Sequence, residues 1–501
     1  MNRPPQKLVV VGRDAPLWLA VNVLQTALRP AGVEVTAVVL PGRAWLQDVL
    51  VTQPALEPLH HLLGVDEAEL LRATGGAFTL GQRFVDNGGT GASFFLPHGS
   101  HGAPIDGRPF FPYWLKARAF GLRVPLEDFS LTAAAAGQGR IAVPDPATET
   151  FWRTDYGYHL PAAAYAAFLK GLAARSRVEV HEARRVTAVL DSGSGSILAL
   201  DLGDGRRVEG QFFIDVTGED AALIGGTLSV GRESWRPFFP ADRALAAAPQ
   251  RTGSLPAHGQ VQAHGEGWFG YYPALDRIHL TLAYTSDLCG DDQALQVAAR
   301  AWGARLDDAV VNPLDPGRRV RAWDRNCVAL GSAACAFDPL LGLELQALQT
   351  GLVHFLSLYP VGGEMGVERD EYNRVAQQAY ERMRDVQSAL YRLNRWTPSA
   401  FWRRAAEGAV SDELRHKIAT FAARGEIAYF ENESLDEDGW QALFAGLGLE
   451  AESYRPDIEA TSPETMKREF RRILAFIAGQ VGGQMMHEAY LRRVNRTEAL
   501  A

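Results

Sequence analysis

The stretch KLVVVGRDAPLWLA, from Lys7 to Ala20, constrains the fold of this chain more than any other. A short apolar run ends at Gly12, where a tight turn begins, and apolar residues then recur at helical spacing. A strand, a glycine turn and a helix in this order open a dinucleotide-binding domain, whose turn normally carries three glycines beside the diphosphate. Here Asp14 and Leu17 stand at the second and third glycine positions. A carboxylate on Asp14 would repel a diphosphate, and Leu17 would crowd the helix against the strand.

The composition is that of an ordinary globular protein, and it narrows the classes of partner. The chain has 501 residues, enough for two domains. Its net charge is −9 and it has no basic block, which argues against nucleic acid and against an anionic membrane. The three cysteines lack metal-ligand spacing, so we expect no metal site and no disulfide framework. Because the sequence has no signal peptide and no apolar run of spanning length, we expect a cytoplasmic protein.

The order of strand and helix patterns predicts an α/β protein with two domains. Apolar runs within 33–40, 178–216, 277–286 and 327–330 indicate strands, and strand signals fade from Glu368 onward. Helical spacing predicts helices over 56–71, 368–393, 412–424 and 462–493. We therefore predict a large α/β domain over residues 1–365 and a helical domain over residues 366–501.

Six stretches spread along the chain carry a family resemblance. They are HHLLGVDEAELLRATGGAFTLGQRF (60–84), YGYHLPAAAYAAFLKGLA (156–173), FFIDVTG (212–218), RIHLTLAYTSDLCGDDQA (277–294), NCVALGSAACAFDPL (326–340) and EYNRVAQQAYERMRDVQSALYRLNRWTPSAFW (371–402). In this order and spacing they resemble the flavin-dependent tryptophan halogenases. The resemblance implies a Rossmann-like, FAD-binding domain of the flavin monooxygenase and halogenase type, with large sheets, an inserted substrate-side sheet and a C-terminal helical domain. For an active member it also implies FAD, a flavin reductase as partner and an indole or phenol as substrate.

The resemblance places the family's halogen chemistry on positions that have changed in this chain. In the family, reduced flavin and oxygen oxidise halide to hypohalous acid, a lysine delivers the halogen, and a carboxylate takes the proton. The lysine position is Thr79, whose hydroxyl cannot form a haloamine. Lys116 is the least unfavourable substitute, although we expect a surface lysine there. The base position is Leu341. Glu344 is a displaced base if a helix starts there, or simply a carboxylate stabilised at a helix start.

Other family positions concern the flavin and the aromatic wall beside it. The residues at flavin-contacting positions are Gly12, Arg13, Gly218, Gly331, Ala333 and Pro339. The turns of the fold alone would explain most of them, since glycine needs no ligand to justify a positive φ. The family's flavin loop should follow the second strand, but the sequence WLQDVLVT at 45–52 does not match it.

The family's Trp-x-Trp-x-Ile-Pro motif, which forms the aromatic wall beside the flavin, is only partly present in this chain. Trp268 and Pro273 remain, whereas Gly270 replaces the second tryptophan and Tyr272 replaces the isoleucine. Removing an indole leaves a hole unless neighbours fill it. The aromatic residues that could line an old substrate cavity are Phe111, Trp114, Trp268, Tyr271 and Tyr272. The alternative is that these side chains form ordinary core.

Two functions follow from these observations. The first is a non-halogenating, halogenase-like protein with weak or no FAD binding, which binds an aromatic or other apolar small molecule, a protein partner or a second copy of itself. The second is an active FAD-dependent halogenase or monooxygenase acting on an aromatic substrate, with Arg13 at the diphosphate and Glu344 as base. We favour the first because the losses fall on separate segments and each would need its own rescue.

Overall fold

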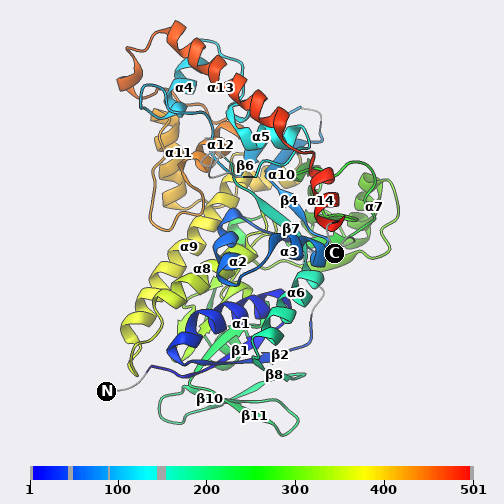
Figure 1. The fold of residues 1–501 in the computed structure, drawn as a ribbon, viewed down its shortest axis with the longest axis vertical. Helices are drawn as coiled ribbons and strands as arrows, with labels where there is room; N and C mark the ends of the chain where they lie inside the picture. Colours follow the sequence, from blue (N-terminus) through cyan, green and yellow to red (C-terminus); the bar gives the residue numbers. More distant parts are fainter. Residues whose placement is uncertain (1–3, 43–48, 89–90, 144–153, 497–501) are drawn as a thin grey trace. The chain divides into compact units, whose positions relative to one another are not determined.

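The computed structural model describes residues 4–42, 49–88, 91–143 and 154–496, and they form a mixed α/β fold with several sheets (Figure 1). Contacts divide the chain into two units, each assembled from three segments. Unit 1 comprises Met1–Gly75, Leu160–Pro237 and Pro313–Arg384, and unit 2 comprises Gly76–His159, Phe238–Asn312 and Asp385–Ala501. The sequence-based boundary at residue 365 stays a prediction; the helix α9, Gly366–Arg392, begins directly after it.

Unit 1 is built on a six-stranded sheet in the order β20-β21-β12-β1-β2-β8. Its elements are β1 Lys7–Gly12, α1 Asp14–Leu28, β2 Glu34–Val39, β3 Val49–Val51, α2 Glu57–Leu62, α3 Glu67–Thr74, α6 Ala162–Arg175, β8 Glu179–Glu182, β9 Thr187–Leu190, β10 Ile197–Asp201, β11 Arg207–Glu209, β12 Phe212–Val216, β13 Arg232–Ser234, β19 Gly317–Arg319, β20 Trp323–Asp324, β21 Cys327–Ala329, β22 Cys335–Ala336, α8 Glu344–Ser357 and most of α9.

The first strand lies inside this sheet, as its continuous apolar run predicts. β1 pairs in parallel with β12 on one side and with β2 on the other, so that Gly12 is level with Val216 and Val39. All residues of β1 after Lys7 are buried, as expected for a parallel sheet that is covered on both faces. α1 packs beside α6 and also contacts α8. The carboxyl ends of β1, β2 and β12 therefore form the edge at which α/β proteins usually bind ligands.

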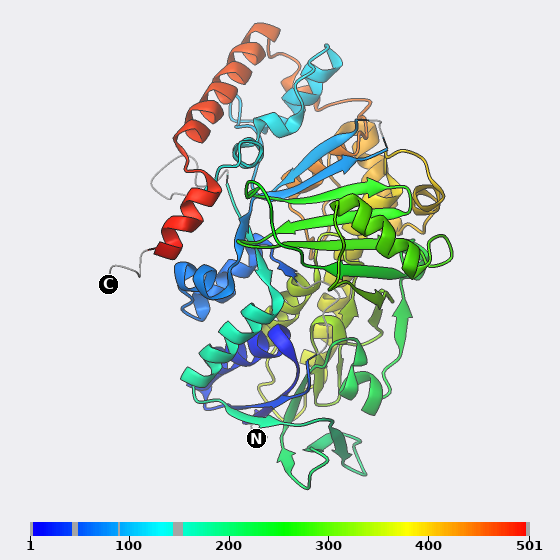
Figure 2. The ribbon, with the colours of Figure 1, turned by 90° about the vertical axis from the view of Figure 1, so that its right-hand side faces the viewer.

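Unit 2 is built on a seven-stranded sheet in the order β18-β14-β17-β16-β15-β5-β6 (Figure 2). Its elements are β4 Ala77–Thr79, β5 Gly81–Asp86, β6 Ser93–Pro97, α4 Phe110–Ala119, α5 Leu131–Gly137, β7 Gly157–Pro161, β14 Arg243–Ala247, β15 Gly259–His264, β16 Gly267–Pro273, β17 Ile278–Tyr284, α7 Asp291–Trp302, β18 Val310–Pro313, α10 Ala400–Ala406, α11 Asp412–Arg424, α12 Glu437–Gly446, α13 Pro463–Gly483 and α14 His487–Arg496.

Helices cover this sheet at two places. α7 buries its apolar side against β14, β16 and β17, in a core that includes Leu245, Phe269, Leu282 and Val297. α12 packs against the edge strand β6, and α13 packs against α4 and α5. An edge strand covered by a helix cannot pair with another chain, which removes an aggregation hazard.

Two of the predicted helices are each divided in the structure. The helix predicted over 56–71 is interrupted at Gly64, whose φ is +63°, and α3 then starts afresh with Asp66 accepting a hydrogen bond from the Glu69 amide. The helix predicted over 462–493 has the expected cap at Ser462, but it divides into α13 and α14. Periodicity alone missed both breaks, because the apolar spacing resumes after each of them.

Candidate functional site

The turn after β1 keeps Gly12 but lacks the other two glycines of a dinucleotide-binding turn. A β-carbon on Gly12 would overlap the carbonyl oxygen of Val216, so strand packing requires glycine there whether or not a ligand binds. Asp14, the first residue of α1, has a φ of +57°, in the left-handed region that favours glycine. The turn has therefore kept the conformation of a dinucleotide-binding loop, although a side chain now projects from its second glycine position.

The carboxylate of Asp14 lies against the backbone that follows β2. A β-carbon built on Gly42 would be 2.7 Å from the Asp14 Oδ1. Leu40 donates its amide to the Gly12 carbonyl at 2.8 Å, so the end of β2 and the turn are neighbours. In dinucleotide-binding domains this crevice receives the ribose and the diphosphate. An anion beside Asp14 would meet like charge, and these residues do not fit a bound diphosphate.

The cation next to this turn is already paired. Arg13 Nη1 lies 3.0 Å from Asp220 Oδ2, and the Arg13 side chain is only 14% exposed. Leu17, at the third glycine position, is fully buried and packs α1 onto the sheet. The predicted role of Arg13, a contact to the diphosphate, stays a prediction, and it would require Arg13 to leave Asp220.

Unit 1 gathers further carboxyl groups at the ends of its central strands. Glu344 begins α8, as the displaced-base interpretation requires. Burial raises the pKa of Glu344 to about 7, and the carboxyls of Asp338 and Glu219 add to that rise. Asp215, at the end of β12, accepts hydrogen bonds from the Thr217 amide and hydroxyl and from two amides of the next turn. Asp215 therefore shapes this turn.

The family's base position lies in a tight leucine-rich turn. Leu341 is buried and has a φ of +71°, and Gly342 follows with a φ of +62°. A β-carbon on Gly342 would lie 2.8 Å from Cβ of Val51, so this position accepts only glycine. An alkyl side chain at Leu341 cannot take a proton. Glu344 as a base, and the turn as a halide site, stay predictions.

The other flavin-contact positions are explained by backbone conformation. Gly218 and Gly331 have φ values of +72° and +57°. Ala333 is buried at the end of a short helical turn that begins at Gly331, and Pro339 precedes the leucine-rich turn. Contact of these residues with FAD stays a prediction. In the expected flavin loop, residues 45–48 lie outside the described residues, and β3 follows them.

In unit 2, the family's lysine position holds a hydroxyl that bonds within its own turn. Thr79 ends β4, is buried, and donates its hydroxyl to the Gly81 carbonyl at 2.9 Å. It pairs in register with Gly157 of β7. The position offers no amine and no positive charge with which to hold hypohalite.

The lysine considered as a substitute serves a different purpose. Lys116 is buried, so the expectation of a surface lysine was wrong. Its ammonium group donates to the carbonyls of Ile458, Glu459 and Thr461 at 3.3, 2.8 and 3.3 Å. Carbonyl oxygens take the place of water around this charge, which is why a lysine can be buried here. Lys116 therefore ties α4 to the chain before α13.

A second buried lysine in unit 2 forms an ion pair. Lys417 Nζ lies 2.5 Å from Glu433 Oε1 and donates to the Ala428 carbonyl at 2.6 Å. The indole of Trp440 donates to the other Glu433 oxygen at 3.0 Å and lies 4.7 Å from the ammonium group. This amine is also enclosed and satisfied.

The hole expected from the lost indole is filled by a neighbouring side chain. A β-carbon on Gly270 would lie 2.6–2.8 Å from the ring and hydroxyl of Tyr272, two residues further along β16. The tyrosine ring thus covers the space in front of Gly270. Trp268 stays fully buried and donates its indole N–H to Tyr391 Oη at 2.7 Å. The two substitutions in this motif compensate each other sterically.

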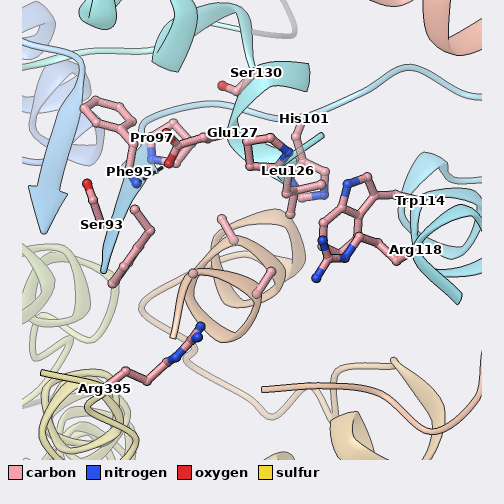
Figure 3. A pocket seen from close by; sticks show the side chains of 15 residues that line it. Ser93, Phe95, Pro97, His101, Trp114, Arg118, Leu126, Glu127, Ser130 and Arg395 are labelled. Atoms are coloured by element: carbon pink, nitrogen blue, oxygen red, sulfur yellow. Dashed lines mark hydrogen bonds between the residues drawn. The ribbon is translucent and has the colours of Figure 1, made fainter. Parts of the chain in front are cut away.

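The predicted aromatic cavity is only partly assembled. Phe111 and Trp114 of α4 stack with ring centroids 5.6 Å apart, and Trp114 lines a hollow of about 240 Å³ (Figure 3). Phe111 is not among the described residues that line this hollow, and neither are Trp268, Tyr271 and Tyr272 of β16. Sequence reasoning missed Arg118 and Arg395, which do line it. The spacing of Trp114 and Arg118, one helical turn apart, could have indicated the first of them.

Two further findings concern metals and membranes. In the described part of the chain, no group of three or more His, Cys, Asp or Glu side chains could hold a metal ion. Among the same residues, no helix combines the length and the apolarity that crossing a bilayer would need.

Known proteins share this fold and this sequence pattern. The sequence matches the tryptophan halogenase family over residues 7–463. It is 25% identical to the tryptophan 7-halogenase KtzQ of Kutzneria sp. (strain 744), with 98% of each chain covered. It is 24% identical to the tryptophan 6-halogenase ThaL of Streptomyces albogriseolus, with 90% of each covered. The structure of BrvH, a flavin-dependent halogenase from Brevundimonas sp. BAL3, matches with a TM-score of 0.93 at 30% identity, covering 98% of this chain and 99% of that one. The chain therefore belongs to the tryptophan halogenase family and has its FAD-binding, Rossmann-like fold.

Proposed function

We propose that this protein is a non-halogenating member of the family that binds FAD weakly or not at all and acts by binding a small molecule or a protein partner. The observation that carries the proposal is the Asp14 carboxylate, which lies against Gly42 in the crevice where the diphosphate would bind. Placing a diphosphate there would bring two anions together or force the turn to move. Either change weakens binding, because the left-handed turn is fixed between β1 and α1.

Changes in both units support the same proposal. Thr79 and Leu341 carry neither the amine nor the carboxylate that halogen transfer uses, and the amines of Lys116 and Lys417 are enclosed by other partners. The ring of Tyr272 covers the place of the lost indole, so restoring that indole would require Tyr272 to move. Well-packed replacements indicate a protein selected to stay folded rather than one accumulating damage.

A second candidate function is an active FAD-dependent halogenase or monooxygenase acting on an aromatic substrate, served by a flavin reductase. Glu344 favours it, because a carboxyl with a pKa of about 7 at the start of a helix suits a general base. An open hollow of about 670 Å³ at the ends of β2 and β8, with Arg184 and Arg185 on its wall, also favours it by leaving room for a nucleotide.

An activity assay separates the two candidates. The full chain is incubated with FAD, a flavin reductase, NADH, oxygen and bromide against a panel of indoles and phenols, and the products are analysed by mass spectrometry. We expect no brominated or hydroxylated product, while an active halogenase of the family in the same mixture gives one. A brominated product that depends on this protein and disappears in the Glu344→Gln variant would overturn the proposal in favour of the second candidate.

A further inference from the structure

A hollow within unit 2 has the chemistry of a ligand site and lies apart from the residues discussed as flavin or halogen positions. Strand β6, helix α4, the chain after α9 and helix α12 surround it (Figure 3). Its wall on α12 consists of small residues, Ala442, Ala445 and Gly446. The ring of Phe94 takes the space in front of Gly446, so the room for a ligand lies beside Ala442 and Ala445.

Two arginines reach this hollow without a carboxylate partner. Within the described parts of the chain, no Asp or Glu lies within ion-pair distance of Arg118 or Arg395. Arg118 donates to the Leu122 carbonyl at 3.4 Å and lies over the indole ring of Trp114. Glu127 also lines the hollow, but both of its oxygens are occupied, by Arg83 at 2.8 Å and by the Phe95 amide at 2.5 Å. The hollow is thus locally positive in a chain of net charge −9.

Both arginines are exposed residues, and each guanidinium lies against a neighbouring group. A β-carbon on Gly448, whose φ is +73°, would overlap the guanidinium of Arg395, so this glycine provides the surface on which Arg395 lies. The Arg118 guanidinium lies 5.5 Å from the ring of Trp114, and the Trp114 indole is fixed by a bond to the Val124 carbonyl at 3.2 Å. In Figure 3 the two side chains enter the hollow from different sides.

The remaining wall is apolar and limits the size of a ligand. Phe95, Pro97 and Leu126 line it opposite the small residues of α12. The volume, about 240 Å³, is below that of sites for drug-sized molecules. A second hollow of about 200 Å³ shares Ser93, Phe94, Arg395 and Gly446 with the first, which puts Arg395 where the two meet.

From this arrangement we propose that unit 2 binds a small organic carboxylate with a short apolar body. Arg395 and Arg118 hold the carboxylate, because a planar guanidinium matches the two oxygens of a carboxylate. The apolar body lies between Phe95, Leu126 and the small residues of α12. This site needs neither flavin nor halide, so it is independent of the function proposed above.

Calorimetric titration of the full chain tests the site. The probes are benzoate and hexanoate, with benzamide and hexanamide as neutral matches and inorganic phosphate as an anion without an apolar body. We expect the two carboxylates to bind at least about tenfold more tightly than their amides, since a bond to a charged group is lost in the amide. We expect phosphate to bind more weakly than either carboxylate.

Variants assign the binding to this hollow. Arg395→Gln should weaken benzoate binding about tenfold or more and Arg118→Gln several-fold, whereas Arg300→Gln, at an exposed position on α7, should leave it unchanged. Ala445→Leu should block binding by filling the hollow, and thermal unfolding of each free variant checks that it is folded. Equal binding of amides and carboxylates, equal binding of phosphate, or equal effects of Arg395→Gln and Arg300→Gln would overturn the proposal. No detectable binding of either carboxylate would overturn it as well.

Discussion

The β1–α1 turn of unit 1 and the hollow of unit 2 differ in the sign of their charge. At the turn, the Asp14 carboxylate lies against Gly42 and Arg13 is paired with Asp220. In the hollow, the carboxylate of Glu127 is neutralised by Arg83, and two arginines remain without a carboxylate partner among the described residues. The turn thus carries a carboxylate at the ligand-binding edge of its sheet, whereas the hollow carries two guanidinium groups. On the two proposals made above, a diphosphate binds poorly at the first and a carboxylate binds at the second.

The largest expected effect is the loss of stability when the buried Lys417 of unit 2 is replaced. This substitution tests whether the Lys417–Glu433 ion pair stabilises the fold. Lys417→Met leaves Glu433 buried without its cation, and should lower the free energy of unfolding by about 3–5 kcal/mol. Lys467→Met, at an exposed position of α13, should change it by less than about 0.5 kcal/mol. Chemical denaturation measures both. Similar small losses in the two variants would mean that the Lys417–Glu433 pair is not a structural anchor.

A pH series tests the acidic side of the comparison. The pKa of Glu344 is raised in the folded state from 4.5 to about 7, so the folded protein binds the extra proton between these values. Stability contributed by Glu344 is therefore present below about pH 4.5 and is lost as the pH rises through 7, by at most about 3.4 kcal/mol. Glu344→Gln should remove this fall.

The buried histidines also make stability depend on pH over this range, so the series needs a control that separates their effect from that of Glu344. Burial lowers the pKa of His60 and His101 to about 4, so these groups make the protein more stable as the pH rises from about 4 to 6.5, the opposite sign. The difference between wild type and Glu344→Gln at each pH isolates the glutamate. If that difference stays constant from pH 4 to 8, the raised pKa of Glu344 is refuted.

Substitutions at Gly270 and Tyr272 test whether the Tyr272 ring fills the space left by the lost indole. Gly270→Ala should destabilise the protein by about 1–3 kcal/mol, because the new methyl group meets the ring of Tyr272. In the Tyr272→Ile background the same substitution should cost about 1 kcal/mol less or be neutral, and a double-mutant cycle by denaturant unfolding measures the coupling. Additive effects would indicate that Tyr272 does not cover Gly270.

The smallest expected effect is on the stability of the turn itself. Asp14→Gly should stabilise the protein by up to about 1 kcal/mol, because glycine adopts the left-handed conformation of this position without strain. Asp14→Ala removes the same carboxylate but keeps the β-carbon, and should be less stable than Asp14→Gly. Equal melting temperatures for the two variants would show that the positive φ carries no strain.

Much of the secondary structure could be predicted from the sequence, because apolar spacing and helix capping act over only a few residues. The buried strand β1 and the helices α9 and α11 follow from apolar spacing and capping, and the structure has all three. The displaced-base alternative required a helix that starts near Glu344, and α8 begins there. The resemblance gave the family, because ordered motifs survive the loss of individual side chains. Gly218 and Gly331 could be interpreted as turn residues for the same reason, and both have a positive φ.

Features that depend on distant residues could not be predicted in this way. The burial of Lys116 depends on carbonyls more than three hundred residues further along the chain. The filling of the lost indole depends on which way the Tyr272 ring turns, and the hollow near Trp114 depends on Arg395 and α12. No periodicity in the sequence encodes these contacts, since each is made by tertiary packing.

Titration of the purified full chain with FAD, followed by the quenching of flavin fluorescence, tests the central claim most directly. We expect a colourless protein and no saturable quenching at micromolar FAD, with tighter binding in Asp14→Gly than in wild type because a carboxylate has been removed from the crevice. A yellow protein, or saturation of the wild type with micromolar affinity or better, would contradict it.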